Sequence, residues 1–69
     1  MSYLIIYNIK RLDSATRLRV NRRLRRLGAL KLQHSVWESD DISELKNLVG
    51  AIKSSGGNAF ITRKRIVAE

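Results

Sequence analysis

A dense run of arginines is the feature of this sequence with the clearest chemistry. Six arginines lie within ten residues, with no acidic residue among them, at positions Arg17, Arg19, Arg22, Arg23, Arg25 and Arg26. A guanidinium group can bind phosphate through two parallel hydrogen bonds, and neutralising phosphates supplies much of the affinity for nucleic-acid backbone. An ordinary solvated helix face mixes both signs of charge, which this run does not. The run therefore predicts binding to a polyanion, with nucleic acid first and an acidic membrane surface second.

The positive charge of the chain is concentrated in one segment. Residues 10–31 hold nine Lys and Arg residues and one acid, Asp13, so this segment carries the whole formal net charge of +8. The rest of the chain is neutral overall. Such a local excess favours a polyanionic partner.

Other residue types that often do chemistry are sparse. The chain has no cysteine, and its single histidine, His34, stands without a metal-ligand partner at a suitable spacing. Ser35 has no base beside it, so the sequence gives no nucleophile signature. Trp37 can stack on a base, but an anchor for a sheet face or a dimer interface is the favoured interpretation. We therefore predict no catalytic residue, no metal ligand and no cofactor.

The arginine run is expected to lie on a helix over residues 14–27. Asp13 or Ser14 can cap its start, and Gly28 stands where a helix would end in a left-handed turn. At about 100° per residue, one narrow sector of this helix is apolar and docks it on a core. That sector contains Val20, Leu24 and Leu27. Leu18 points away from it among the arginines, where it is either simply exposed or touches a partner.

Three segments are expected to form strands. Residues 2–9 are a continuous apolar run that suits a central strand buried on both faces. Residues 29–39 alternate between two faces and predict one strand or a kinked pair, with His34 packed on the apolar face. Residues 59–67 are β-branched and aromatic with a basic centre, which fits a last strand at a sheet edge or a dimer contact.

A second helix completes the order of elements. Asp41 followed by Glu44 resembles a capping box, apolar residues follow at helical spacing, and the helix is expected to end near residues 56–57. Strand, helix, strand pair, helix and strand predict an α+β sandwich of the ferredoxin-like βαββαβ type, with two helices on one face of an antiparallel sheet. Residues 1–69 are expected to form a single domain.

The length of the chain bears on its assembly. A domain of 69 residues buries only about 60% of the surface of its unfolded chain, so its own core is marginal. With no cysteines for disulfides, stability must come from packing or from a partner chain, and we expect a homodimer. The N-terminus has no signal-peptide pattern and no long apolar run is present, so we expect a cytoplasmic protein without a membrane partner.

Two segments resemble a known family of small proteins. Residues 5–9 read IIYNI and residues 30–39 read LKLQHSVWES, on either side of the basic helix and Gly28. This combination resembles the small CRISPR-associated Cas-two family, in which an apolar strand ends in Tyr-Asp-Ile and a later segment reads Val-Gln-Tyr-Ser-Val-Phe-Glu. His34 and Trp37 replace aromatic residues of that pattern. The resemblance covers roughly residues 3–54. The residues that match directly are Tyr7, Ile9, Gln33, Ser35, Val36 and Glu38.

The resemblance implies a ferredoxin-like homodimer that joins two dimers of a Cas-one integrase and contacts spacer DNA during CRISPR adaptation, a form of antiviral defence. It also implies that Arg17, Arg19 and Lys31 are functional basic residues. Together with the helix geometry, this gives a set of expected nucleic-acid contacts. The set is Arg17, Arg19, Arg22, Arg23, Arg26 and Lys31.

Some family members are metal-dependent nucleases, and the resemblance ties their activity to the aspartate that follows the strand-one tyrosine. This sequence has Asn8 at that position. Mg²⁺ favours anionic oxygen ligands, and an amide carbonyl can coordinate the ion but cannot neutralise its charge. We therefore expect a duplex-DNA-binding scaffold without catalysis of its own. The alternatives are a Mg²⁺-dependent endoribonuclease or deoxyribonuclease of the same family or a toxin-like relative, and a small interaction module that uses the strand over residues 61–67.

Overall fold

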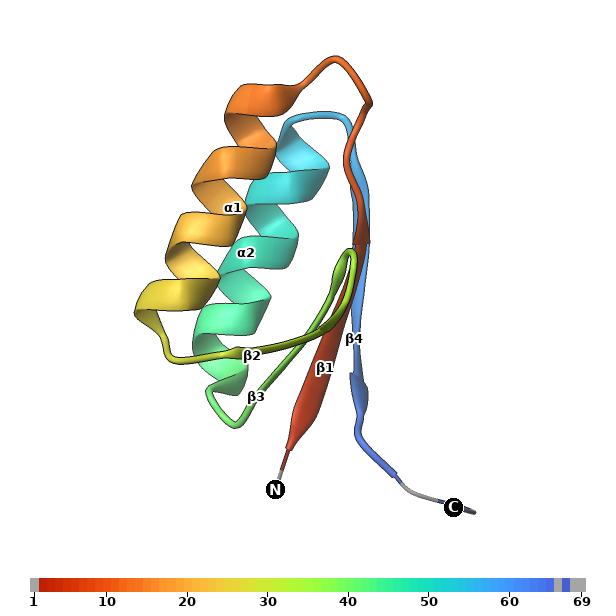
Figure 1. The fold of residues 1–69 in the computed structure, drawn as a ribbon. Helices are drawn as coiled ribbons and strands as arrows, with labels where there is room; N and C mark the ends of the chain where they lie inside the picture. The colour runs from red at the N-terminus through yellow and green to blue at the C-terminus, as the bar shows by residue number, and fades with distance from the viewer. Residues whose placement is uncertain (1, 66, 68–69) are drawn as a thin grey trace.

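Two helices cover one face of a four-stranded sheet (Figure 1). The computed structural model describes residues 2–65 and residue 67. In chain order the elements are β1 (Tyr3–Asn8), α1 (Ser14–Arg26), β2 (Leu30–Gln33), β3 (Val36–Ser39), α2 (Ile42–Ser54) and β4 (Asn58–Arg63). The sheet order is β2-β3-β1-β4 and every neighbouring pair is antiparallel. The predicted α+β ferredoxin-like fold is confirmed.

Strand β1 is central, as its apolar sequence predicts, because it pairs with both β3 and β4. Ile5 and Tyr7 point toward the helices and are buried in the core. The expectation that both faces of this strand are buried is wrong. Leu4 and Ile6 alternate onto the face that carries no helix, and they stay only half-buried.

Helix α1 begins and ends where its sequence predicts. The Asp13 carboxylate accepts a hydrogen bond from the backbone N–H of Thr16 at 3.1 Å and caps the first turn. Val20 and Leu24 are fully buried against the sheet. Gly28 follows the helix with φ of 77°, a left-handed conformation that glycine adopts without strain.

The segment expected to be one strand or a kinked pair is a tight hairpin of β2 and β3. His34 and Ser35 form its turn, and Ser35 has φ of 69°. The expectation that His34 packs on an apolar face is therefore wrong, because the turn removes it from the strand and leaves it exposed. Trp37 is buried on the helix-covered face and 3% exposed, so its predicted role as an anchor of a sheet face is confirmed.

Helix α2 uses part of the predicted capping box. The Asp41 carboxylate accepts from the backbone N–H of Glu44 at 3.1 Å, while the N–H of Asp41 donates to Ser39 Oγ. The Glu44 side chain points instead toward α1. The helix ends at Ser54, and Gly57 follows at a position where a Cβ would lie 2.7 Å from the carbonyl oxygen of Asn8. Only glycine permits this close approach.

Strand β4 lies at the sheet edge, as predicted, but it is shorter than the predicted segment of residues 59–67. It ends at Arg63, and Lys64 still donates its backbone N–H to the carbonyl of Ser2 at 3.0 Å. Residue 66 lies outside the described residues. On the helix-free face, Phe60 of β4 stands opposite Ile6 of β1 and is 56% exposed.

Candidate nucleic-acid interface

Helix α1 presents its arginines from a firmly seated backbone. One side of the helix packs on the sheet through Val20 and Leu24, and the N-cap fixes its first turn. Of the six arginines on α1, Arg17 is half-buried and the other five are exposed. The exposed members are Arg19, Arg22, Arg23, Arg25 and Arg26. The helix is thus a rigid rod with cationic side chains on its solvent side.

The two long flanks of α1 each border a hollow. The outer hollow, on the flank away from α2, has a volume of about 220 Å³ and is lined by Leu18, Asn21, Arg22 and Arg25. The interhelix hollow has a volume of about 400 Å³ and is lined by Arg23, Arg26, Leu27 and Glu44. Within the predicted contact set, Arg22 borders the outer hollow, whereas Arg23 and Arg26 border the interhelix hollow. Arg25, which borders the outer hollow beside Arg22, is not a member of that set.

An acid enters the interhelix hollow. Glu44 of α2 accepts a hydrogen bond from Arg23 Nη2 at 2.7 Å, and the two side chains are 33% and 44% exposed. This ion pair connects the two helices and neutralises the charge of Arg23 locally. The sequence predicts Arg23 as a contact for nucleic acid. The structure gives this side chain a partner within the protein, Glu44, which the sequence did not reveal.

Two residues of the predicted contact set, Arg17 and Lys31, do not belong to the exposed arginines of α1. Arg17 Nη2 donates to the backbone carbonyl of Lys10 at 3.2 Å, which ties the start of α1 to the preceding loop. Lys31 of β2 is exposed and is the Cα partner of Trp37. Because paired residues project to the same side of a sheet, Lys31 lies on the side that α1 covers.

A polar chain runs beneath α1. Trp37 Nε1 donates to the hydroxyl of Tyr7 at 3.1 Å, and that hydroxyl donates to Asn21 Oδ1 at 3.0 Å. Burial raises the pKa of Tyr7 above its ordinary value, against the smaller lowering effects of the Trp37 hydrogen bond and of the Arg17 charge. The Tyr7 hydroxyl therefore stays protonated and available as a donor over the physiological pH range.

Sequence reasoning did not identify Asn21 as a site residue. On a helical wheel it falls at the border between the buried stripe and the arginines, which is a weak signal. Its partner Tyr7 lies 14 positions away along the chain. Only the packing of α1 on β1 brings the two side chains together.

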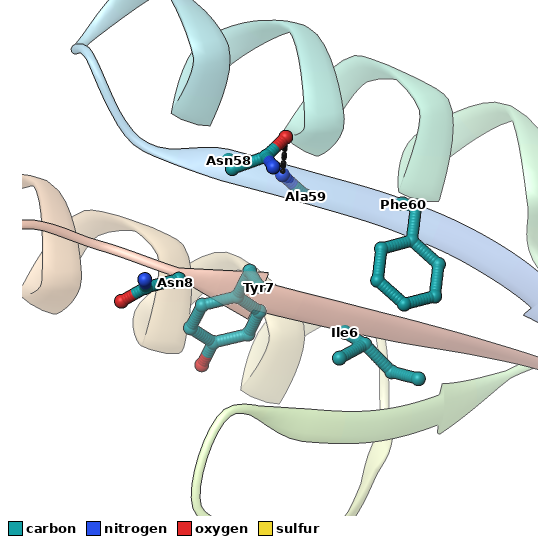
Figure 2. A pocket seen from close by; sticks show the side chains of 6 residues that line it. All are labelled: Ile6, Tyr7, Asn8, Asn58, Ala59 and Phe60. Carbon is teal, nitrogen blue, oxygen red and sulfur yellow. Dashed lines mark hydrogen bonds between the residues drawn. The ribbon is translucent and has the colours of Figure 1, made fainter.

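Asn8 stands where the Cas-two pattern has the aspartate tied to metal-dependent cleavage. It is exposed at the end of β1, opposite Asn58 of β4. A hollow of about 110 Å³ at this end of the strands is lined by residues of β1 and β4 (Figure 2). The lining residues are Ile6, Tyr7, Asn8, Asn58, Ala59 and Phe60. None carries a carboxylate, and Asn58 Oδ1 already accepts from the N–H of Ala59 at 2.9 Å.

The donor set of this hollow does not suit Mg²⁺ in a single chain. Two neutral amides offer carbonyl oxygens without the negative charge that this hard cation favours. Across residues 2–65 and 67, no group of three His, Asp or Glu side chains is arranged to hold a metal ion.

Among the described residues, no helix has the length and apolar character needed to cross a membrane. Comparison of the sequence with protein-family models and with curated proteins finds no match.

Proposed function

We propose that this protein binds the backbone of nucleic acid, with duplex DNA as the favoured form, and acts as a homodimeric scaffold without nuclease activity. The observation that carries the proposal is the exposed arginine surface of α1 on a helix that is capped, docked and tied to the sheet. Phosphate binding needs such donors held in place, because ordering flexible side chains lowers the net affinity.

The dimensions of α1 fit this role. Its 13 residues span about 20 Å at 1.5 Å per residue. Duplex DNA presents roughly six phosphates per strand over that length. The contacts are with phosphate and not with base edges, so binding is expected to be insensitive to sequence.

The helix-free face of the sheet supports the homodimer. Its central residues are apolar, with Ile6 and Phe60 at their centre, and its acid Glu38 is paired with Lys64 at 3.0 Å. Two copies of the basic α1 surface repel each other, whereas two helix-free faces do not. A dimer formed through these faces leaves both α1 helices on the outside, where each can contact the same duplex.

Binding of the natural chain to fluorescein-labelled 30-base-pair duplexes tests the proposal. Fluorescence anisotropy at low salt is expected to show binding to two duplexes of unrelated sequence with similar affinity. An unlabelled duplex should compete, and a single-stranded DNA and a duplex RNA of equal length define the preferred form. Absence of binding to every nucleic acid at low salt would overturn the proposal.

The narrower role follows only from the resemblance to the Cas-two family. It adds a Cas-one integrase as a partner, work on DNA in the cytoplasm, and participation in CRISPR adaptation. A neighbouring integrase gene with a repeat array, and co-purification of the two proteins, would support this role. DNA binding without such a neighbour would favour a free-standing relative.

A further inference from the structure

The outer hollow of α1 brings together side chains of complementary character. Arg22 follows Leu18 by four residues, Arg25 follows Asn21 by four, and the two pairs are offset by three, so all four side chains share one side of the helix. Arg22 and Arg25 are exposed, and among the residues that the structure describes no acid lines this hollow. An anion that enters it meets two guanidinium groups and an amide above the apolar side chain of Leu18.

The amide of Asn21 is held in one orientation from below. An indole N–H can only donate, so Trp37 Nε1 makes the Tyr7 hydroxyl its acceptor. The Tyr7 hydroxyl then uses its single proton to donate a hydrogen bond to Asn21 Oδ1. Because Oδ1 is engaged with the sheet, the other end of the amide, Nδ2 with its two protons, is available to the hollow.

The interhelix hollow has the opposite character. Glu44 lies 2.7 Å from Arg23 Nη2 and places a carboxylate in the space that an anion would need. An approaching phosphate would have to separate this ion pair and meet the repulsion of the acid. Phosphate is therefore favoured in the outer hollow over the interhelix hollow.

We propose that Asn21, Arg22 and Arg25 form a phosphate subsite for nucleic-acid backbone, and that Arg23 instead fixes α1 against α2 through Glu44. In this subsite, Tyr7 and Trp37 are positioning residues that act through Asn21. Leu18, which is 61% exposed, offers an apolar contact for the neighbouring sugar. The inference rests on the proposed nucleic-acid binding and specifies which part of α1 performs it.

Two double variants with matched charge test the placement. Arg22→Gln with Arg25→Gln, and Arg23→Gln with Arg26→Gln, each remove two positive charges from the same helix. Each lost charged hydrogen bond is expected to weaken duplex binding roughly tenfold. For each protomer that contacts the duplex, the first double variant should therefore lose about 100-fold in affinity and about 1.8 in salt slope, so that in the proposed dimer its slope falls by about 3.6. The second should lose less than about fivefold.

A second pair of variants tests Asn21 itself. Asn21→Asp keeps an oxygen for the Tyr7 hydroxyl but turns the donor that faces the hollow into an anion. It is expected to weaken duplex binding more than about tenfold, since it replaces a donor with a repelling charge. Asn47→Asp makes the same charge change at an exposed position of α2 and should have an effect of less than about threefold. Circular dichroism melting checks that all four proteins fold.

The outcomes separate this inference from the proposed function. If the natural chain binds DNA and both members of each pair weaken binding equally, nucleic-acid binding stands and the subsite is wrong. If the natural chain does not bind any nucleic acid, the proposed function fails and the subsite fails with it. Selective loss in Arg22→Gln with Arg25→Gln and in Asn21→Asp supports the subsite.

Discussion

At the scale of single residues, Tyr7 connects the core to the proposed interface. Its ring fills the space between β1 and the helices, and its hydroxyl accepts a hydrogen bond from Trp37 Nε1 and donates one to Asn21 Oδ1. A phenylalanine could fill the same space but could not orient the amide. The hydroxyl therefore has a structural role and, in the proposed subsite, a role in positioning Asn21.

Tyr7→Phe is expected to reduce both stability and affinity. The buried Trp37 N–H loses its acceptor, which costs about 1 to 3 kcal/mol. Each kcal/mol lowers the Tm of a domain of this size by roughly 4 to 8 °C. Thermal unfolding followed by circular dichroism measures the effect, with Tyr3→Phe at the half-buried end of the same strand as the control. An unchanged Tm would show that the polar chain adds nothing to stability.

Asn8 gives a prediction about catalysis. Its neighbours in the hollow of β1 and β4 supply amide and apolar groups, so the natural chain is expected to leave duplex DNA and single-stranded RNA intact with Mg²⁺ or Mn²⁺. Denaturing gels after long incubation provide the measurement, and Asn8→Ala identifies any contaminating nuclease. Cleavage by the natural chain that disappears in Asn8→Ala would instead establish the metal-dependent nuclease.

At the scale of elements, α1 combines a strong local signal with long-range contacts. Its N-cap and its apolar stripe are both local in sequence, and both were predicted from spacing. Its ion pair to α2 and its hydrogen bond to β1 depend on how the three elements pack. These long-range contacts give Arg23 an acid partner and fix Asn21 beside Arg22.

The cap of α1 also gives the protein a defined pH response. Hydrogen bonds from the Thr16 side chain and backbone lower the pKa of Asp13 below its ordinary value of 3.8. A carboxyl whose folded pKa is lowered stabilises the protein fully above its unfolded pKa, and this contribution disappears as the pH falls through the folded pKa.

Asp13→Asn tests that response. The amide oxygen can still cap the helix, so the variant should keep most of the natural stability at pH 7. Between about pH 5 and pH 2, the Tm of the natural chain should fall more steeply than that of the variant. The carboxylate of Asp13 takes up a proton in this range, whereas the asparagine amide of the variant does not. Parallel Tm profiles over this range would contradict the proposed cap.

Much of the fold could be predicted from sequence, because hydrophobic spacing and caps are local. The hairpin shows the limit, since continuous alternation over residues 29–39 hid a two-residue turn and misplaced His34. The site shows another limit. Arginine clustering identified the helix, but the roles of Asn21 and Arg23 depend on partners in other elements, Tyr7 and Glu44.

At the scale of the whole molecule, the two faces have different chemistry. Both helices lie on one face of the sheet and leave the other face without a helix (Figure 1). The helix face carries the cationic surface of α1, while the other face exposes apolar strand residues such as Phe60 of the edge strand β4. A chain of this size has little core of its own. Association through the helix-free face would bury the apolar surface and leave the cationic surface available.

Phe60→Glu is expected to prevent the proposed dimer. A charged side chain in the centre of the apolar face would be desolvated on association without a partner. Light scattering coupled to size-exclusion chromatography should give a dimer mass for the natural chain and a monomer mass for the variant. Leu12→Glu is the matched control, because Leu12 is 96% exposed in a loop, and it should remain dimeric. A monomeric natural chain would contradict the dimer.

The salt dependence of duplex binding is the sharpest test of arginine–phosphate contacts by α1. Dissociation constants are measured by anisotropy for the natural chain between about 50 and 200 mM salt, a range over which phosphate contacts have large effects. If two α1 helices each contribute at least two arginine–phosphate contacts, log affinity should fall with log salt at a slope of about 3.5 or more. A slope near zero, or no binding at the lowest salt, would show that the arginines of α1 do not bind nucleic-acid backbone.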